Sequence, residues 1–272
     1  GLKLISLLNS GKKTLVNHNT QKRKVLVYGA YGNQSVGDDA ILRSIIDNIK
    51  VYSKDKFDIE LIVSTYRPEE TAEEFNVKTV KQGRTLNGIC YISEIISEID
   101  LVIFGGGGLL ETHDKKIKSY LGILYKLSKI FFALSKNKRV MFFAIGSNIE
   151  PYNWFTNKII KFLGNKVDFI TTRDINSEKF LIDKGICKNI VKTTADPAFL
   201  LEKDDFISEN IPKDLLSELR HQNYIGINVM TYHLITNDTI SLEKCRNGIA
   251  KLADYLITEK QLKILFIPMV YY

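Results

Sequence analysis

The sequence predicts an α/β protein built on a parallel sheet with helices on both faces. Short apolar runs, typical of strands buried on both faces, alternate along the chain with longer segments whose apolar residues recur at helical spacing. The connections between them are short, as in βαβ units. With 272 residues, of which 44% are hydrophobic, the chain is long enough for one large core or two ordinary ones.

Most of the chain is assigned to a first Rossmann-like domain, residues 24–205, which follows a lysine-rich and polar N-terminal arm, residues 1–23. Right-handed crossovers place the carboxyl ends of its strands at one edge of the sheet, where sheets of this class bind ligands. Its predicted strands are 24–29, 59–65, 77–80, 101–104, 139–145, 167–172 and 189–194. Its predicted helices are 38–50, 68–75, 89–99, 115–138, 153–163 and 177–184.

A second α/β domain is predicted to follow a polar, acidic linker and to occupy residues 206–272. A buried strand at 224–229, a helix at 242–258 and a strand at 262–268 form one βαβ unit. One such unit cannot bury both faces of its own sheet, so we expect this second domain to be incomplete.

Four consecutive glycines close the apolar strand at 101–104. We call Gly105, Gly106, Gly107 and Gly108 the tetraglycine segment. Glycines adopt positive φ readily and leave peptide N–H groups uncovered, so the segment is predicted to bind an anionic substrate. The alternative is a mobile glycine turn that binds nothing.

A second glycine-rich turn joins the first predicted strand to the first predicted helix. Gly32 and Gly37 have the spacing of a phosphate-binding loop, but Asp38 and Asp39 stand where Lys and Ser or Thr would hold phosphate and magnesium. Carboxylates and the Asn33 amide suit sugar hydroxyls or proton transfer instead. We therefore predict catalytic roles for Asp38 and Asp39. Gly32 and Asn33 are predicted to bind substrate. The structural alternative is that both acids complement the helix dipole, with Asp38 as the N-cap.

Further candidates follow other predicted strands at the same edge. Gly146 and Ser147 are expected to bind substrate there, and Arg173 offers a fixed fork of donors for a carboxylate or a phosphate. The alternative for Arg173 is a pair with Asp174 or a helix-capping role. His113, which follows the tetraglycine segment, is a candidate proton donor, although a lone surface histidine often has no such role.

Charge and composition narrow the set of partners. The net charge of +7 favours polyanions, phosphorylated small molecules or an anionic membrane surface. Neither a nucleic-acid-binding motif nor zinc-ligand spacing is found, so neither nucleic acid nor a metal is expected. Cys90, Cys187 and Cys245 are isolated, which argues against a disulfide framework and favours a reducing cytoplasm.

Two segments bear on a membrane. No apolar run reaches the length of a transmembrane helix, and the N-terminus lacks the pattern of a secretory signal. The helix at 115–138 has an apolar stripe surrounded by lysines. It is expected to cover the core, or alternatively to lie on the inner face of an anionic membrane.

The motifs together resemble the polysaccharide pyruvyl transferase family. Their order and spacing over residues 24–230 carry the resemblance. The matching residues are Gly32-Asn33, Gly37 to Leu42, Val102 to Leu109, Ala144 to Gly146, Thr172 to Asp174 with Ser177 and Leu181, Asp196 to Ala198, and Ile225 to Val229. The resemblance implies two facing Rossmann-like domains of the glycosyltransferase B type, with the site in the cleft between them. The sequence departs from the family after Val229, where no Arg-Leu-His motif follows, so an incomplete donor site is implied.

The resemblance also implies the reaction: the enolpyruvyl carbons of phosphoenolpyruvate pass to two hydroxyls of a sugar in a cell-surface polysaccharide or its precursor, and a pyruvyl ketal forms. No cofactor beyond this co-substrate is expected. Phosphoenolpyruvate carries a carboxylate and a phosphate, for which Arg173 and the tetraglycine segment offer donors. Asp38, Asp39 and His113 are the candidates for the acid and the base. The acceptor is expected to be a saccharide, either free or lipid-linked.

Two other functions fit the same residues. A nucleotide-sugar-dependent glycosyltransferase has the same architecture, because a fold does not determine its donor. A non-catalytic docking protein of polysaccharide assembly would use the basic helix to contact a membrane.

Overall fold

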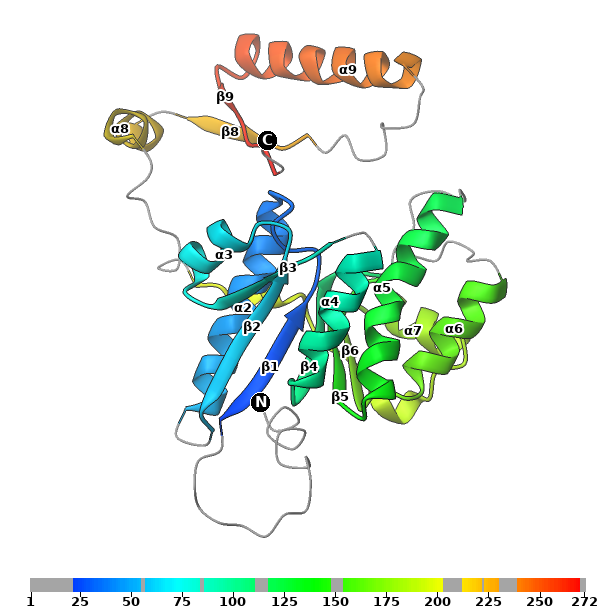
Figure 1. Cartoon of the computed structure of the whole chain (residues 1–272). Coiled ribbons are helices and arrows are strands. Elements are labelled where there is room, and N and C mark those ends of the chain that lie inside the picture. The colour runs from blue at the N-terminus through cyan, green and yellow to red at the C-terminus, as the bar shows by residue number, and fades with distance from the viewer. Residues whose placement is uncertain are drawn as a thin grey trace. The chain divides into compact units, whose positions relative to one another are not determined.

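The structure is a computed structural model (Figure 1), and it describes residues 22–54, 57–83, 86–110, 117–147, 154–202, 212–221, 223–229 and 239–269. The chain divides into two units, Gly1–Leu201 and Glu202–Tyr272. His113 lies outside the described residues.

The first unit contains a seven-stranded sheet in the order β3-β2-β1-β4-β5-β6-β7, and every neighbouring pair is parallel (Figure 1). The strands are β1 (Arg23–Tyr28), β2 (Ile59–Thr65), β3 (Lys78–Lys81), β4 (Leu101–Gly107), β5 (Arg139–Ile145), β6 (Phe169–Thr172) and β7 (Val191–Thr193). The strand order reverses between β1 and β4. In a doubly wound sheet, this switch point is where a crevice opens at the carboxyl ends of the strands.

Helices cover both faces of this sheet, as predicted. They are α2 (Val36–Ser53), α3 (Pro68–Phe75), α4 (Leu86–Ser97), α5 (Ile117–Ser135), α6 (Trp154–Gly164) and α7 (Ile175–Asp183), with the short 3₁₀ turns η1 (Lys188–Ile190) and η2 (Pro197–Leu200). Alternate residues of β1 belong to two separate cores. Val25 and Val27 pack with α2, whereas Leu26 and Tyr28 belong to the core formed with α4, α5, α6 and α7. The strand is therefore buried on both faces, as its unbroken apolar run indicated.

Helix boundaries follow from local chemistry. Pro68 starts α3, where its missing N–H costs nothing, and Asn76 ends it in the left-handed conformation with φ of 48°. The Asp174 carboxylate caps α7 by accepting a hydrogen bond from the backbone N–H of Ser177 at 2.7 Å. Gly185, with φ of +83°, follows the end of α7.

The second unit is a βαβ unit preceded by one helix. It contains α8 (Lys213–His221), β8 (Tyr224–Ile227), α9 (Thr239–Thr258) and β9 (Lys263–Phe266), and β8 pairs with β9 in parallel. The predicted strand, helix and strand are therefore present. Within the described part of the chain, no helix combines the length and the hydropathy required to cross a bilayer.

Candidate functional site

The two glycine-rich segments meet at the switch point of the sheet. β1 and β4 are parallel neighbours in register from Val25 with Leu101 to Tyr28 with Phe104. Directly beyond them, the Tyr31 hydroxyl donates a hydrogen bond to the carbonyl oxygen of Gly105 at 2.8 Å. The prediction that both turns lie at one edge is confirmed.

The tetraglycine segment differs from its prediction because it is not a loop from its first residue. β4 continues to Gly107, and Gly105 and Gly107 are in register with Phe143 and Ile145 of β5. The strand continues because its parallel pairing with β5 extends beyond Phe104, which the sequence alone does not show. Residues 105–107 therefore form the end of a strand and not a turn.

Two of these glycines are required for helix packing. A methyl group at Gly106 would lie 2.1 Å from Cγ2 of Ile41, and Gly106 has φ of +70°. A methyl group at Gly105 would lie 3.0 Å from Cδ1 of Ile45. The side chains of α2 thus press directly against the backbone of β4, and at Gly106 only glycine allows this approach.

Gly107 lies closer to an acid than to a hydrophobic side chain. It has φ of +72°, and a methyl group there would lie 3.4 Å from Oδ1 of Asp38. The first turn of α2 therefore places the Asp38 carboxylate over the bare backbone at the carboxyl end of β4.

Asp38 is not the helix N-cap, and this prediction is wrong. The helix begins two residues earlier than predicted, and Ser35 caps it by accepting a hydrogen bond from the backbone N–H of Asp38 at 3.4 Å. The Asp38 side chain is half-buried, and this burial raises the pKa of its carboxyl group above the usual value of 3.8. The hydrogen bond with Ser35 and the positive charges of Lys126 and Arg173 act in the opposite direction. Because Ser35 occupies the N-cap position, Asp38 has no capping role at the start of α2.

The Asp39 carboxylate influences a different residue, Glu74 on α3. Consecutive helical residues point about 100° apart, and the Asp39 carboxylate contributes to the raised pKa of Glu74 on α3, whose main cause is burial. Arg43 opposes that shift. Of the two adjacent acids, the contacts place Asp38 beside the tetraglycine segment.

Arg173 lies at the same edge, directly after β6. Its backbone N–H donates to the carbonyl oxygen of Ile145, and a methyl group at Gly146 would lie 2.5 Å from its Nε. The backbone N–H of Gly146 in turn donates to the carbonyl oxygen of Gly107 at 2.7 Å. Arg173, Gly146 and Gly107 thus form a continuous series of contacts. Together with Asp38 they are called the carboxyl rim below.

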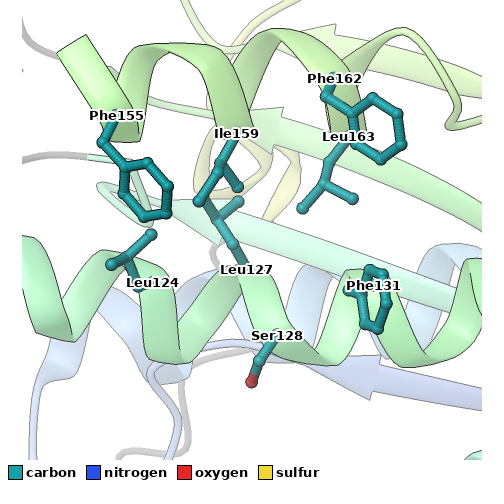
Figure 2. A pocket seen from close by; sticks show the side chains of 8 residues that line it. All are labelled: Leu124, Leu127, Ser128, Phe131, Phe155, Ile159, Phe162 and Leu163. Atoms are coloured by element: carbon teal, nitrogen blue, oxygen red, sulfur yellow. The ribbon is translucent and has the colours of Figure 1, made fainter.

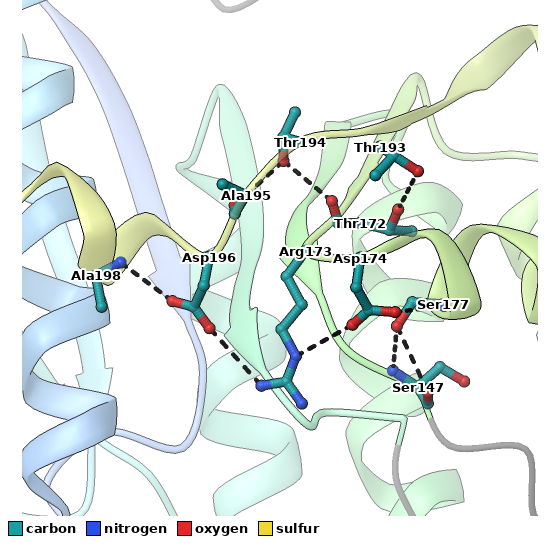
Figure 3. A network of polar contacts seen from close by, with 10 residues as sticks. All are labelled: Ser147, Thr172, Arg173, Asp174, Ser177, Thr193, Thr194, Ala195, Asp196 and Ala198. Atoms are coloured by element: carbon teal, nitrogen blue, oxygen red, sulfur yellow. Dashed lines mark hydrogen bonds and ion pairs between the residues drawn. The ribbon is translucent and has the colours of Figure 1, made fainter.

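Two acids hold the guanidinium in place (Figure 3). Nε of Arg173 lies 3.6 Å from Oδ2 of Asp174, and one terminal nitrogen lies 3.8 Å from Oδ2 of Asp196. Both carboxylates also accept backbone N–H groups, from Ser177 and Ala198, so they are themselves fixed. The predicted pair with Asp174 is present, and so is the predicted position at the rim.

Ser147 extends the rim towards α7. Its backbone N–H donates to Oγ of Ser177 at 3.0 Å (Figure 3), while its own hydroxyl oxygen is buried without a hydrogen-bond partner among the described residues. A buried hydroxyl of this kind is a candidate donor to a ligand.

Gly32 and Asn33 have local structural partners. A methyl group at Gly32 would lie 2.3 Å from Oγ1 of Thr65, and Gly32 has φ of +74°. The exposed Asn33 donates from Nδ2 to the carbonyl oxygen of Ala30 at 2.9 Å. Both contacts shape the turn. The substrate-binding roles of these two residues stay predictions.

Lys126 is a rim residue that the sequence did not single out. It projects from α5, and its Nζ donates to the carbonyl oxygen of Leu109 at 3.2 Å. Its charge also lowers the pKa of Asp38. In the sequence it is one of many lysines on a basic helix, and no local signal distinguishes it. Among the described residues, no group of three or more His, Cys, Asp or Glu side chains is arranged to hold a metal ion.

A parallel sheet that reverses at β1 and β4, with glycines, an acid and an arginine at that edge, defines a doubly wound, Rossmann-like α/β protein. The sequence profile of the polysaccharide pyruvyl transferase family matches residues 36–272, and the chain belongs to this family. A search of curated protein sequences finds no match.

Solved structures agree with the fold. Similar structures include a protein from Listeria monocytogenes described as a UDP-N-acetylglucosamine 2-epimerase (12% identity, TM-score 0.59), S. aureus MnaA with UDP (12%, 0.57) and the UDP-GlcNAc 2-epimerase from Neisseria meningitidis bound to UDP-GlcNAc (11%, 0.57). The alignments cover 91% of this chain in each case, but 62%, 63% and 66% of those proteins respectively. At such identities the likeness establishes the fold alone.

Proposed function

We propose that the protein transfers the pyruvyl carbons of phosphoenolpyruvate to two hydroxyls of a sugar in a cell-surface polysaccharide or its precursor, forming a pyruvyl ketal. Family membership supports a pyruvyl transferase. The observation that supports the donor is the carboxyl rim, where Arg173 lies over Gly146, which is hydrogen-bonded to Gly107, and where Arg173 is within electrostatic reach of Asp38. The cytoplasm, which the isolated cysteines favour, is the proposed compartment.

The rim suits a small dianion. Phosphoenolpyruvate carries a carboxylate and a phosphate close together, and Arg173 and Lys126 are two cations that both act on Asp38. Arg173 is the better partner for a planar, bidentate group, and Lys126 acts as a point charge. Gly107 itself adds no side chain to this part of the rim.

Ketal formation requires several proton transfers. The methylene carbon of the enol gains a proton, the oxygen of one sugar hydroxyl bonds to the adjacent carbon, and phosphate leaves as that carbon bonds to the second hydroxyl oxygen. Each hydroxyl loses its proton, so one proton goes to the methylene and the other to phosphate. Asp38 is the proposed carrier at the rim, because burial raises its pKa, so that more of the carboxyl group holds a proton at a given pH and the ionised form is a stronger base. Asp39 and His113 remain further candidates.

The test uses the full-length protein, phosphoenolpyruvate and saccharide acceptors. We expect acceptor-dependent release of phosphate, together with a product whose mass exceeds that of the acceptor by one pyruvyl ketal group. Phosphoenolpyruvate should also raise the melting temperature, since a ligand at 100 times its Kd stabilises by about 2.7 kcal/mol. Absence of both effects would contradict the proposal.

A nucleotide-sugar-dependent glycosyltransferase is the second candidate. The observation that favours it is the likeness to proteins solved with UDP or UDP-GlcNAc. The same thermal-shift experiment, run with UDP- and GDP-sugars, separates the two functions. Stabilisation by a nucleotide sugar and not by phosphoenolpyruvate would favour the glycosyltransferase.

A further inference from the structure

An apolar groove of about 440 Å³ lies between α5 and α6, and none of the residues of the carboxyl rim lines it. Figure 2 shows Leu124 facing Phe155, and Leu127 facing Ile159 across the groove. It is lined by Leu124, Leu127, Ser128, Phe131, Phe155, Ile159, Phe162 and Leu163. A helix pair that only covers a sheet would direct such side chains inwards, so the groove calls for another explanation.

The apolar surface is broader than the groove itself. The three phenylalanine rings that line it, Phe131, Phe155 and Phe162, are each more than half exposed. Leu121 on α5 and Trp154, the first residue of α6, are also more than half exposed. Large apolar side chains therefore cover the outer surface of both helices along much of their length.

The charged side chains of these two helices have one sign. Neither α5 nor α6 contains an Asp or a Glu. Nζ of Lys158 lies 4.2 Å from the centroid of the Trp154 ring, and Nζ of Lys166 lies 5.0 Å from that of Phe162. The ammonium groups thus lie over exposed aromatic rings, which places positive charge directly beside apolar surface, as a contact with anionic headgroups and the acyl chains beneath them requires.

We propose that the α5–α6 face docks on an anionic phospholipid bilayer. A second copy of the chain in an isologous dimer would bring the same lysines against each other, which electrostatics opposes. The exposed rings extend over two helices and beyond the groove, which suits shallow insertion into a headgroup layer better than capture of one peptide. Surface lysines add attraction to anionic lipids. This proposal does not depend on the proposed reaction.

The position of Trp154 makes a direct test feasible, because it is the only tryptophan in the chain. Its fluorescence is recorded as vesicles of phosphatidylcholine, with or without phosphatidylglycerol, are added to the full chain. We expect a blue shift, and quenching by brominated acyl chains, with the anionic vesicles only, and a response that weakens with salt. Two single variants, Lys158→Glu and Lys166→Glu, should each lower the affinity for anionic vesicles by about fivefold or more.

Matched variants distinguish binding through the α5–α6 face from non-specific binding to vesicles. Phe155→Ser with Phe162→Ser retains the fluorescent reporter and should abolish the shift. Val51→Ser on α2, where the side chain is 68% exposed like that of Trp154, should leave binding unchanged. Lys179→Glu on α7 is the control for charge. If the double serine variant does not fold, as judged by circular dichroism, the two lysine variants still decide the question.

Three results would overturn the proposal. The first is Trp154 emission that does not change with anionic vesicles. The second is an equal loss of binding in the Val51 or Lys179 control. The third is a dimer in sedimentation velocity that the serine substitutions dissociate, because this would assign the face to a second copy of the chain.

Discussion

Replacing Arg173 by alanine tests the donor site most directly. The guanidinium is part-buried, with its side chain 31% exposed, and lies 3.6 Å from Asp174 and 3.8 Å from Asp196. In the proposed complex it donates to an anionic group of phosphoenolpyruvate. A hydrogen bond to a charged group contributes about 1.5–3 kcal/mol, so Arg173→Ala should raise the Kd for phosphoenolpyruvate by about 10- to 150-fold.

The stability of the fold should change much less. The ion pairs of Arg173 are longer than direct hydrogen bonds and reach solvent, so their loss should cost about 1 kcal/mol or less. The measurement is isothermal titration with phosphoenolpyruvate, accompanied by a denaturation curve for each protein.

Arg139 provides a matched control. It is also ion-paired, with Asp168, and its side chain is 37% exposed, but it begins β5 at the opposite edge of the same sheet. Arg139→Ala removes the same charge and should leave the Kd for phosphoenolpyruvate within about twofold. An unchanged Kd in Arg173→Ala, or an equal loss in both variants, would refute the assignment of Arg173 to the donor site.

Three further predictions concern the core and the rim. Asp38→Asn should lower kcat by about 10²- to 10⁴-fold and should remove from the pH profile of kcat a group whose pKa is above 3.8. Asp39→Asn should retain that titration. Identical pH profiles for the two variants would contradict the assignment of Asp38 as the proton carrier. Gly106→Ala should destabilise the fold by about 2–4 kcal/mol in urea unfolding, because the new methyl group meets Ile41 and φ is positive; a variant as stable as the parent would show that α2 can move away. Burial lowers the pKa of Lys129 from 10.5 to about 7, so between these two pH values the unfolded chain holds a proton that the folded chain does not, and the stability of the parent should rise with pH. Lys129→Met should therefore be more stable than the parent near neutral pH, by an amount on the order of 3–5 kcal/mol at most. This difference should shrink towards pH 10.5. A constant difference across that range would contradict the lowered pKa.

Much of the first unit was predictable because its strands are buried on both faces. Such strands give unbroken apolar runs, and the crossover rule then places their carboxyl ends, and Arg173, at one edge. The cap of α2 was mispredicted although Ser35 stands three residues before Asp38, the spacing at which a serine side chain accepts an N–H. The extent of β4 and the role of Lys126 depend on neighbours distant in sequence, and no local pattern encodes those neighbours.

The close seating of Ile41 on Gly106 links the stability of the protein to the placement of its acid. The contact between Ile41 and the bare backbone of Gly106 sets the distance between α2 and β4. Asp38 lies one turn before Ile41 on the same helix, so this contact also sets the distance of its carboxylate from β4. A mutation that lifted the helix would therefore also move Asp38, the proposed proton carrier, relative to the other residues of the carboxyl rim. If Asp38 has that role, activity would depend on Ile41, an aliphatic side chain whose contact is with the backbone of β4.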